Sequence, residues 1–140
     1  MANSPNWLRT PLSWLLLSLK GRISRGIYWL SYFFLICVTS VVVGQLIGGE
    51  HASFFTVAQM IGPFVITGTV YANLAIAVKR LHDIGYSGFL AAAMFIPIIN
   101  FFFTIWVGIV PGTAGPNPYG EAPDRVPTND KVLRSPVLRK

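Results

Sequence analysis

The sequence predicts an all-α integral membrane protein. We expect three transmembrane helices, preceded by an N-terminal interfacial amphipathic helix and followed by an extended Pro/Gly-rich C-terminal tail. Only 11% of the 140 residues are charged and 53% are hydrophobic, whereas a soluble domain carries about 25% charged residues. Three long uncharged stretches hold most of the apolar residues. This composition excludes an ordinary soluble enzyme and a disordered chain.

The first apolar segment, residues 7–19, is too short to cross a bilayer, which takes about 20 apolar residues. Arg9 and Pro11 interrupt it, while Trp7 and Trp14 are amphipathic anchors suited to a membrane surface. We therefore predict a helix that lies in the interface.

Three later stretches are long enough to span: residues 27–47, 54–78 and 89–110. None contains a charged side chain, and each is bounded by charges or by Gly and Pro. Because lipid offers no partners for backbone polar groups, we expect each stretch to form a helix.

The distribution of Lys and Arg predicts the orientation. The segment before residue 27 is rich in cations, the link 48–53 has none, and the link 79–88 begins with Lys79 and Arg80. Because cytoplasmic flanks carry the excess of Lys and Arg, we predict a cytoplasmic N-terminus. Three crossings would then place the C-terminus outside.

The composition changes after residue 110, where Pro and Gly become frequent and exclude regular helix. We predict an ordered turn over 111–123, which completes a single membrane domain of residues 1–123. Residues 124–140 are predicted to form a flexible tail.

Within the predicted spans the polar side chains are few. Gln59 and Asn73 lie on one helix face, and Asn100 follows Pro97 by three residues. We interpret Gln59, Asn73 and Asn100 as interhelical hydrogen-bonding residues. A polar pathway is the alternative, but proton and ion routes usually need an ionisable residue within a span.

Two short segments at the predicted cytoplasmic rim hold most of the remaining chemistry, residues 21–25 and 79–88. Together they contribute the candidate cluster Arg22, Arg25, Lys79, Arg80, His82 and Asp83. Asp83 could accept a forked contact from an arginine and tie the two segments together. The cations could instead bind an anionic headgroup, or simply satisfy the positive-inside rule.

Catalytic signals are close to absent. His82 and Asp83 are neighbours in sequence, so their side chains point apart rather than forming a dyad. There is no phosphate-binding loop, no nucleophile elbow and no metal-ligand spacing. We therefore expect no catalytic residue, cofactor or metal, and a non-enzymatic protein.

The rim segments and the turn carry a family resemblance. The motifs are Gly21-Arg22-Ile23-Ser24-Arg25 with Tyr28-Trp29, Arg80-Leu81-His82-Asp83-x-Gly85-x-Ser87-Gly88, Pro111-Gly112-Thr113 and Asn117-x-Tyr119-Gly120. In order and spacing they resemble the domain of unknown function 805 family of small bacterial inner-membrane proteins. The resemblance covers roughly Leu19 to Pro123. It implies a multi-pass protein of the bacterial inner membrane, without assigning an activity.

These observations leave several functions open. The first is a non-enzymatic inner-membrane protein whose rim cluster is a structural clamp or an anionic-lipid site. The second is an accessory subunit of a larger membrane complex, and the third is an oligomeric transporter or channel component. The expected partners are the bilayer, anionic phospholipid, and a membrane protein or second copy of the chain; nucleic acid is not expected.

Overall fold

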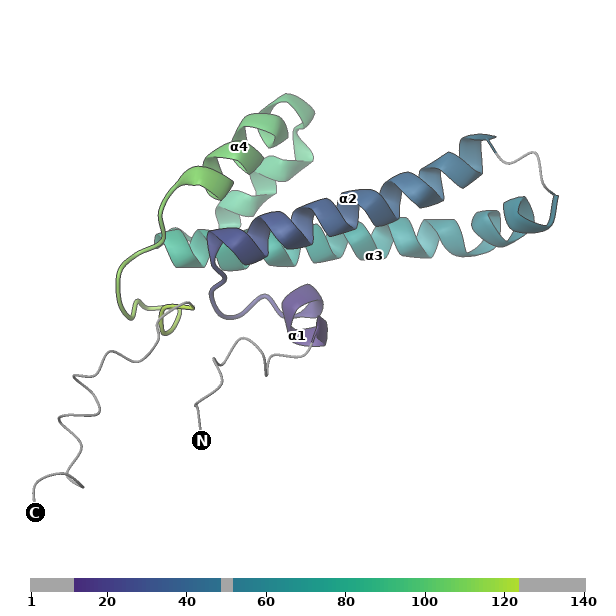
Figure 1. The fold of residues 1–140 in the computed structure, drawn as a ribbon. Helices are drawn as coiled ribbons and strands as arrows, with labels where there is room; N and C mark the ends of the chain where they lie inside the picture. Colours follow the sequence, from purple (N-terminus) through teal and green to yellow (C-terminus); the bar gives the residue numbers. More distant parts are fainter. Residues whose placement is uncertain (1–11, 49–51, 124–140) are drawn as a thin grey trace, which may run out of the picture.

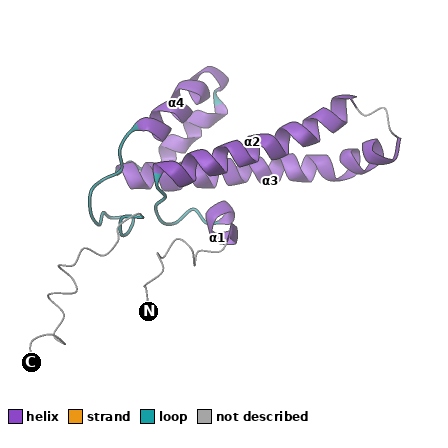
Figure 2. Ribbon diagram, in the orientation of Figure 1, coloured by secondary structure: helices purple, strands orange, loops and turns teal. Residues whose placement is uncertain are grey.

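The computed structural model describes residues 12–48 and 52–123 (Figure 1). These residues form four α-helices and one 3₁₀ helix. In chain order they are α1 (Leu12–Leu17), α2 (Arg25–Gly48), α3 (Ala52–Ile84), η2 (Gly88–Phe95) and α4 (Pro97–Ile109). The described part of the chain contains no strand (Figure 2), only an isolated bridge between Asn117 and Gly120. The all-α prediction is therefore confirmed for these residues.

The two longest helices, α2 and α3, lie side by side and run antiparallel (Figure 1). The stretches Arg25–Ile47 and Thr56–Ile84 are long and apolar enough to cross a membrane. Large apolar side chains point outward from both, including Leu30 at 75% exposure and Phe64 at 78%. Exposed apolar surface of this extent suits contact with lipid rather than water.

The predicted third helix, residues 89–110, is not one continuous helix. The chain forms η2 and then α4, with an extended residue, Ile96, between them. Pro97 begins α4, because a proline lacks a backbone N–H and is best tolerated in the first turn. The 13 residues of α4 extend about 20 Å, which is less than the roughly 30 Å of a hydrocarbon core.

The two segments fold back on each other as a hairpin (Figure 1). At its start, a Cβ added to Gly88 would meet Val78 and His82 of α3. Near its end, the carbonyl of Val107 accepts a hydrogen bond from Arg80 of α3 at 3.1 Å. Both ends of the hairpin therefore lie against the C-terminal end of α3.

The predicted arrangement of three crossings is not confirmed, since two helices of the described residues are long and apolar enough to cross a membrane. Residues 111–123 lie beside residues 20–25, since Arg22 donates to the carbonyls of Thr113 and Gly115. Three crossings would have placed 111–123 at the opposite end of the α2–α3 pair. The prediction counted residues 89–110 as a crossing by length and composition alone, whereas the chain forms two shorter helices there.

Helix α1 packs on the C-terminal half of α3. The Tyr71 hydroxyl donates to the Leu17 carbonyl at 2.8 Å. The helix has six residues, so it is shorter than the predicted segment 7–19. Residues 7–11 and the predicted flexible tail 124–140 lie outside the described residues, and an interfacial position for α1 stays a prediction.

The most deeply buried residues of the hydrophobic core lie where the residues before α2, the start of α2 and the end of α4 meet the C-terminal part of α3. Ile23, Tyr28, Ile76, Leu81 and Val107 come from four different segments, and each is at most 2% exposed. The core therefore fixes the positions of the rim segments relative to α3.

Candidate functional site

Four segments meet at the C-terminal end of α3: the residues preceding α2, the last turns of α3, the end of α4, and residues 111–120. At their junction three charged side chains are buried, because Arg22, Arg80 and Asp83 are 5%, 0% and 3% exposed. We call these three residues the rim clamp. Burial of charge at this level requires pairing and hydrogen bonding.

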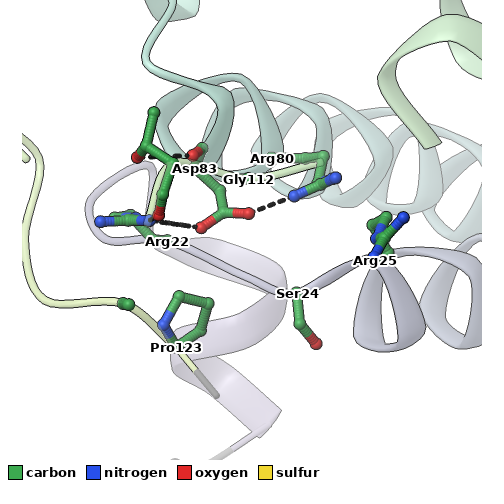
Figure 3. Close-up of a pocket in the computed structure, with 9 residues that line it drawn as sticks. Arg22, Ser24, Arg25, Arg80, Asp83, Gly112 and Pro123 are labelled. Atoms are coloured by element: carbon green, nitrogen blue, oxygen red, sulfur yellow. Dashed lines mark hydrogen bonds and ion pairs between the residues drawn. The ribbon is translucent and has the colours of Figure 1, made fainter. Parts of the chain in front are cut away.

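Asp83 is the acceptor at the centre of the rim clamp (Figure 3). Its Oδ1 accepts from Arg22 Nε at 3.0 Å and Nη2 at 2.9 Å. Its Oδ2 accepts from Arg80 Nη1, three residues earlier on the same helix. A Cβ at Gly112 would overlap the carboxylate, so this position admits only glycine without rearrangement.

The remaining donors of Arg22 fix the segment after α4. Nη1 donates to the carbonyls of Gly115 at 2.7 Å and Gly120 at 3.1 Å, and Nη2 donates to that of Thr113 at 2.9 Å. Together with the two bonds to Asp83, these account for all five guanidinium N–H groups. Arg22 is therefore fully engaged within the protein.

Arg80 performs the equivalent task for α4. Its Nε donates to the carbonyl of Val107, and Nη2 donates to that of Val110. Carbonyls in the last turn of a helix lack intrahelical donors. For Val107 the usual donor four residues later is Pro111, which has no N–H. Arg80 therefore caps α4.

The end of α3 is capped by residues of the turn. The backbone N–H of Thr113 donates to the Asp83 carbonyl at 2.8 Å, and its hydroxyl donates to the same oxygen at 3.1 Å. The Asn117 side chain donates to the His82 carbonyl at 2.8 Å. Gly85, with φ +93°, then redirects the chain in a conformation that favours glycine.

His82 faces away from the rim clamp. Its ring stacks on Tyr119, with 4.0 Å between ring centroids and 4° between planes. Its Nδ1 lies 3.3 Å from the Gly21 carbonyl. His82 and Asp83 thus contact different groups and form no catalytic dyad.

Lys79 belongs to a separate contact with α1. Its Nζ donates to the carbonyls of Trp14, at 2.9 Å, and Leu15. It also lies 4.8 Å from the centroid of a Trp14 ring, a cation–π distance. Lys79 therefore holds α1 against α3 and is not part of the rim clamp.

A cavity of about 210 Å³ opens beside the rim clamp (Figure 3). Arg25, at the first position of α2, is exposed and lies at this cavity. The lining residues are Arg22, Ser24, Arg25, Arg80, Asp83, Gly112, Thr113, Ala122 and Pro123. Three guanidinium groups and one carboxylate therefore face one small polar space.

The polar residues of the spans differ from the prediction of interhelical bonds. Asn73 Nδ2 donates to the Thr69 carbonyl, and Asn100 Oδ1 accepts from Thr104, so both bonds are local to one helix. Gln59 is exposed. A helical side chain reaches the neighbouring turn of its own helix more readily than another helix. Asn73 and Asn100 do line one cavity, of about 480 Å³, between α2, α3 and the hairpin.

Sequence reasoning missed two kinds of contact. Outside the rim, the Thr39 hydroxyl of α2 donates to the Thr69 hydroxyl of α3 at 3.2 Å, a polar contact between the long helices. The backbone carbonyls held by Arg22 were also missed, since carbonyls carry no sequence signal. Over residues 12–48 and 52–123, no group of three His, Cys, Asp or Glu side chains gathers in a way that could hold a metal ion.

Comparison with known proteins identifies the family of this chain. The family described as "Protein of unknown function (DUF805)" matches residues 16–121. The chain is 30% identical over 105 residues to "Inner membrane protein YhaI" of Escherichia coli K12, covering 74% of this chain and 84% of that protein. The protein of that name in Escherichia coli O157:H7 matches equally well. No solved structure matches. The resemblance seen in the rim motifs is thereby confirmed, and the chain belongs to the DUF805 family.

Proposed function

We propose that the protein is a non-enzymatic inner-membrane protein in which α2 and α3 cross the bilayer. In this proposal the η2–α4 hairpin enters from the cytoplasmic face and returns to it. The rim clamp then acts as a structural lock that holds the hairpin and residues 111–120 in place. The observation that carries the proposal is the complete engagement of Arg22, whose five N–H groups all bind acceptors of the protein itself.

Charge and burial support a structural role for the clamp. Each carboxylate oxygen of Asp83 accepts from a different arginine. Removal of one arginine would therefore leave one oxygen without its charged partner. Breaking a buried ion pair costs about 3–5 kcal/mol, because one charge stays buried without compensation. Because the net free energy of unfolding of a protein is only a few kcal/mol, the folded state depends on such a contact.

The apolar surface of the hairpin supports its placement in lipid. Ile98 is 77% exposed and Phe102 is 67% exposed, and both lie on α4. The rim segments carry the cations that mark a cytoplasmic flank. Since residues 111–123 contact these segments, they share the cytoplasmic side.

Reporter fusions test this topology. A fluorescent protein that folds only in the cytoplasm should report when it is joined after Pro123. A phosphatase that is active only outside should be silent at that position and active when it is inserted at residues 49–51. Phosphatase activity after Pro123 would contradict the proposal and restore a third crossing.

The accessory-subunit and transporter hypotheses stay predictions. Purification from native membranes in a mild detergent distinguishes the first from our proposal. A homogeneous species containing only this chain and lipid supports the clamp proposal, whereas a constant second protein supports the subunit hypothesis.

A further inference from the structure

The cavity beside the rim clamp carries more positive charge than the clamp needs. Arg22 and Arg80 share the single carboxylate of Asp83, so the clamp has one excess positive charge. Arg25 lines the same cavity and adds another. The cavity lining therefore carries three guanidinium groups and one carboxylate, which is an excess of two positive charges.

The cavity lining also contains hydrogen-bond donors that have no acceptor among the described residues. Arg22 has none to spare, but Arg80 uses only three of its five N–H groups on Val107, Val110 and Asp83. Its side chain is fully buried and lines the cavity. Two donors of a buried guanidinium therefore lack a protein acceptor among the described residues.

The first turn of α2 adds backbone donors. The N–H of Tyr28 bonds to the Ser24 carbonyl at 3.0 Å, so the earlier N–H groups of this turn lack an intrahelical acceptor. The turn contains no acidic residue. Of the residues at this helix start, Ser24 and Arg25 line the cavity.

We propose that this cavity binds a phosphate group, with Arg25 and Arg80 as its cationic donors and Ser24 at the first turn of α2 beside it. A phosphate oxyanion suits guanidinium donors because the bonds are charge-assisted and fit the planar fork. The volume of about 210 Å³ exceeds the space needed by a few water molecules. The inference rests on the proposed function, because the rim clamp forms one wall of the cavity.

The phosphate could belong to an anionic lipid headgroup or to a free phosphate ion. The decisive measurement is calorimetric titration of the purified full chain in detergent. Three probes separate the sources: short-chain phosphatidylglycerol, short-chain phosphatidylcholine and inorganic phosphate. Tight binding of phosphatidylglycerol alone identifies a lipid headgroup, and tight binding of inorganic phosphate identifies the free ion.

The matched variants are Arg25→Gln and Lys20→Gln. Both remove one exposed cation near the rim, but only Arg25 lines the cavity. A cation beside an anionic headgroup contributes about 1 kcal/mol, so R25Q should weaken binding of the preferred probe about fivefold. K20Q should leave it unchanged, and Arg25→Lys should retain part of the affinity.

The proposal is overturned if R25Q binds every probe as the unaltered chain does, or if no probe binds. Its failure can be separated from failure of the clamp. Arg25 is outside the rim clamp, so R25Q should melt at the temperature of the unaltered chain. Loss of binding with a normal melting temperature supports the phosphate site, whereas loss of both shows that Arg25 supports the fold and contradicts this assignment.

Discussion

Replacement of Asp83 by asparagine removes the charge at the centre of the rim clamp while keeping the shape of the side chain. In the structure Oδ1 accepts two bonds from Arg22 and Oδ2 accepts one from Arg80. An amide offers one oxygen, and its NH₂ group would face a guanidinium, donor against donor. Both arginines are at least nine-tenths buried, so the substitution leaves a largely buried charge without its counter-charge.

The expected loss follows from this geometry. Leaving a buried charge without its partner costs about 3–5 kcal/mol, which for a chain of this size lowers the Tm by about 10 °C. The assay is thermal unfolding of the full chain in detergent, followed by tryptophan fluorescence, with Lys20→Gln as the exposed control. A D83N variant that melts within about 2 °C of the control would refute the clamp.

A double-mutant cycle with Arg22→Gln sharpens the same test. Because R22Q and D83N break one shared contact, the free-energy loss of the double variant should be smaller than the sum of the two single losses, by about 1–3 kcal/mol. Additive losses would show that the two side chains act independently.

Two further predictions use other contacts of the rim. Gly112→Ala should lower the Tm by several degrees, because the added Cβ overlaps the Asp83 carboxylate. The control Gly44→Ala has open space around it and should leave the Tm unchanged or slightly raised. Equal Tm values for the two variants would contradict the packing. Lys79→Met should release α1, because the carbonyls of Trp14 and Leu15 lose their donor. A soluble quencher should then quench tryptophan fluorescence more strongly. Unchanged quenching would show that apolar packing alone holds α1.

Much of the fold could be predicted from hydrophobic patterning. Uncharged stretches of spanning length located α2 and α3, because a helix in lipid needs both length and apolarity. The same criteria were wrong for residues 89–110, where they could not distinguish one long helix from a hairpin. Pro97 was the available signal, since a proline in the middle of an apolar stretch marks a helix start as readily as a kink.

The candidate site was only partly accessible to sequence reasoning. Three of the six candidate rim residues, Arg22, Arg80 and Asp83, meet in one buried contact. For two of the other three, the sequence did not identify the contacting group. Lys79 binds backbone carbonyls and His82 stacks on Tyr119, so their partners depend on the path of the chain. The cavity beside Arg25 likewise exists only because residues 111–123 return to the rim.

The distance between Lys20 and Ala114 tests the central claim most directly. Both residues are exposed. Lys20 lies two residues before Arg22, and Ala114 lies between Thr113 and Gly115, whose carbonyls accept hydrogen bonds from Arg22. Spin labels at these two positions, in a chain with the single Cys37 replaced by Ser, can be measured by pulsed electron resonance in lipid. Our account predicts a distance well below the roughly 30 Å thickness of a hydrocarbon core; a distance above that thickness would contradict it.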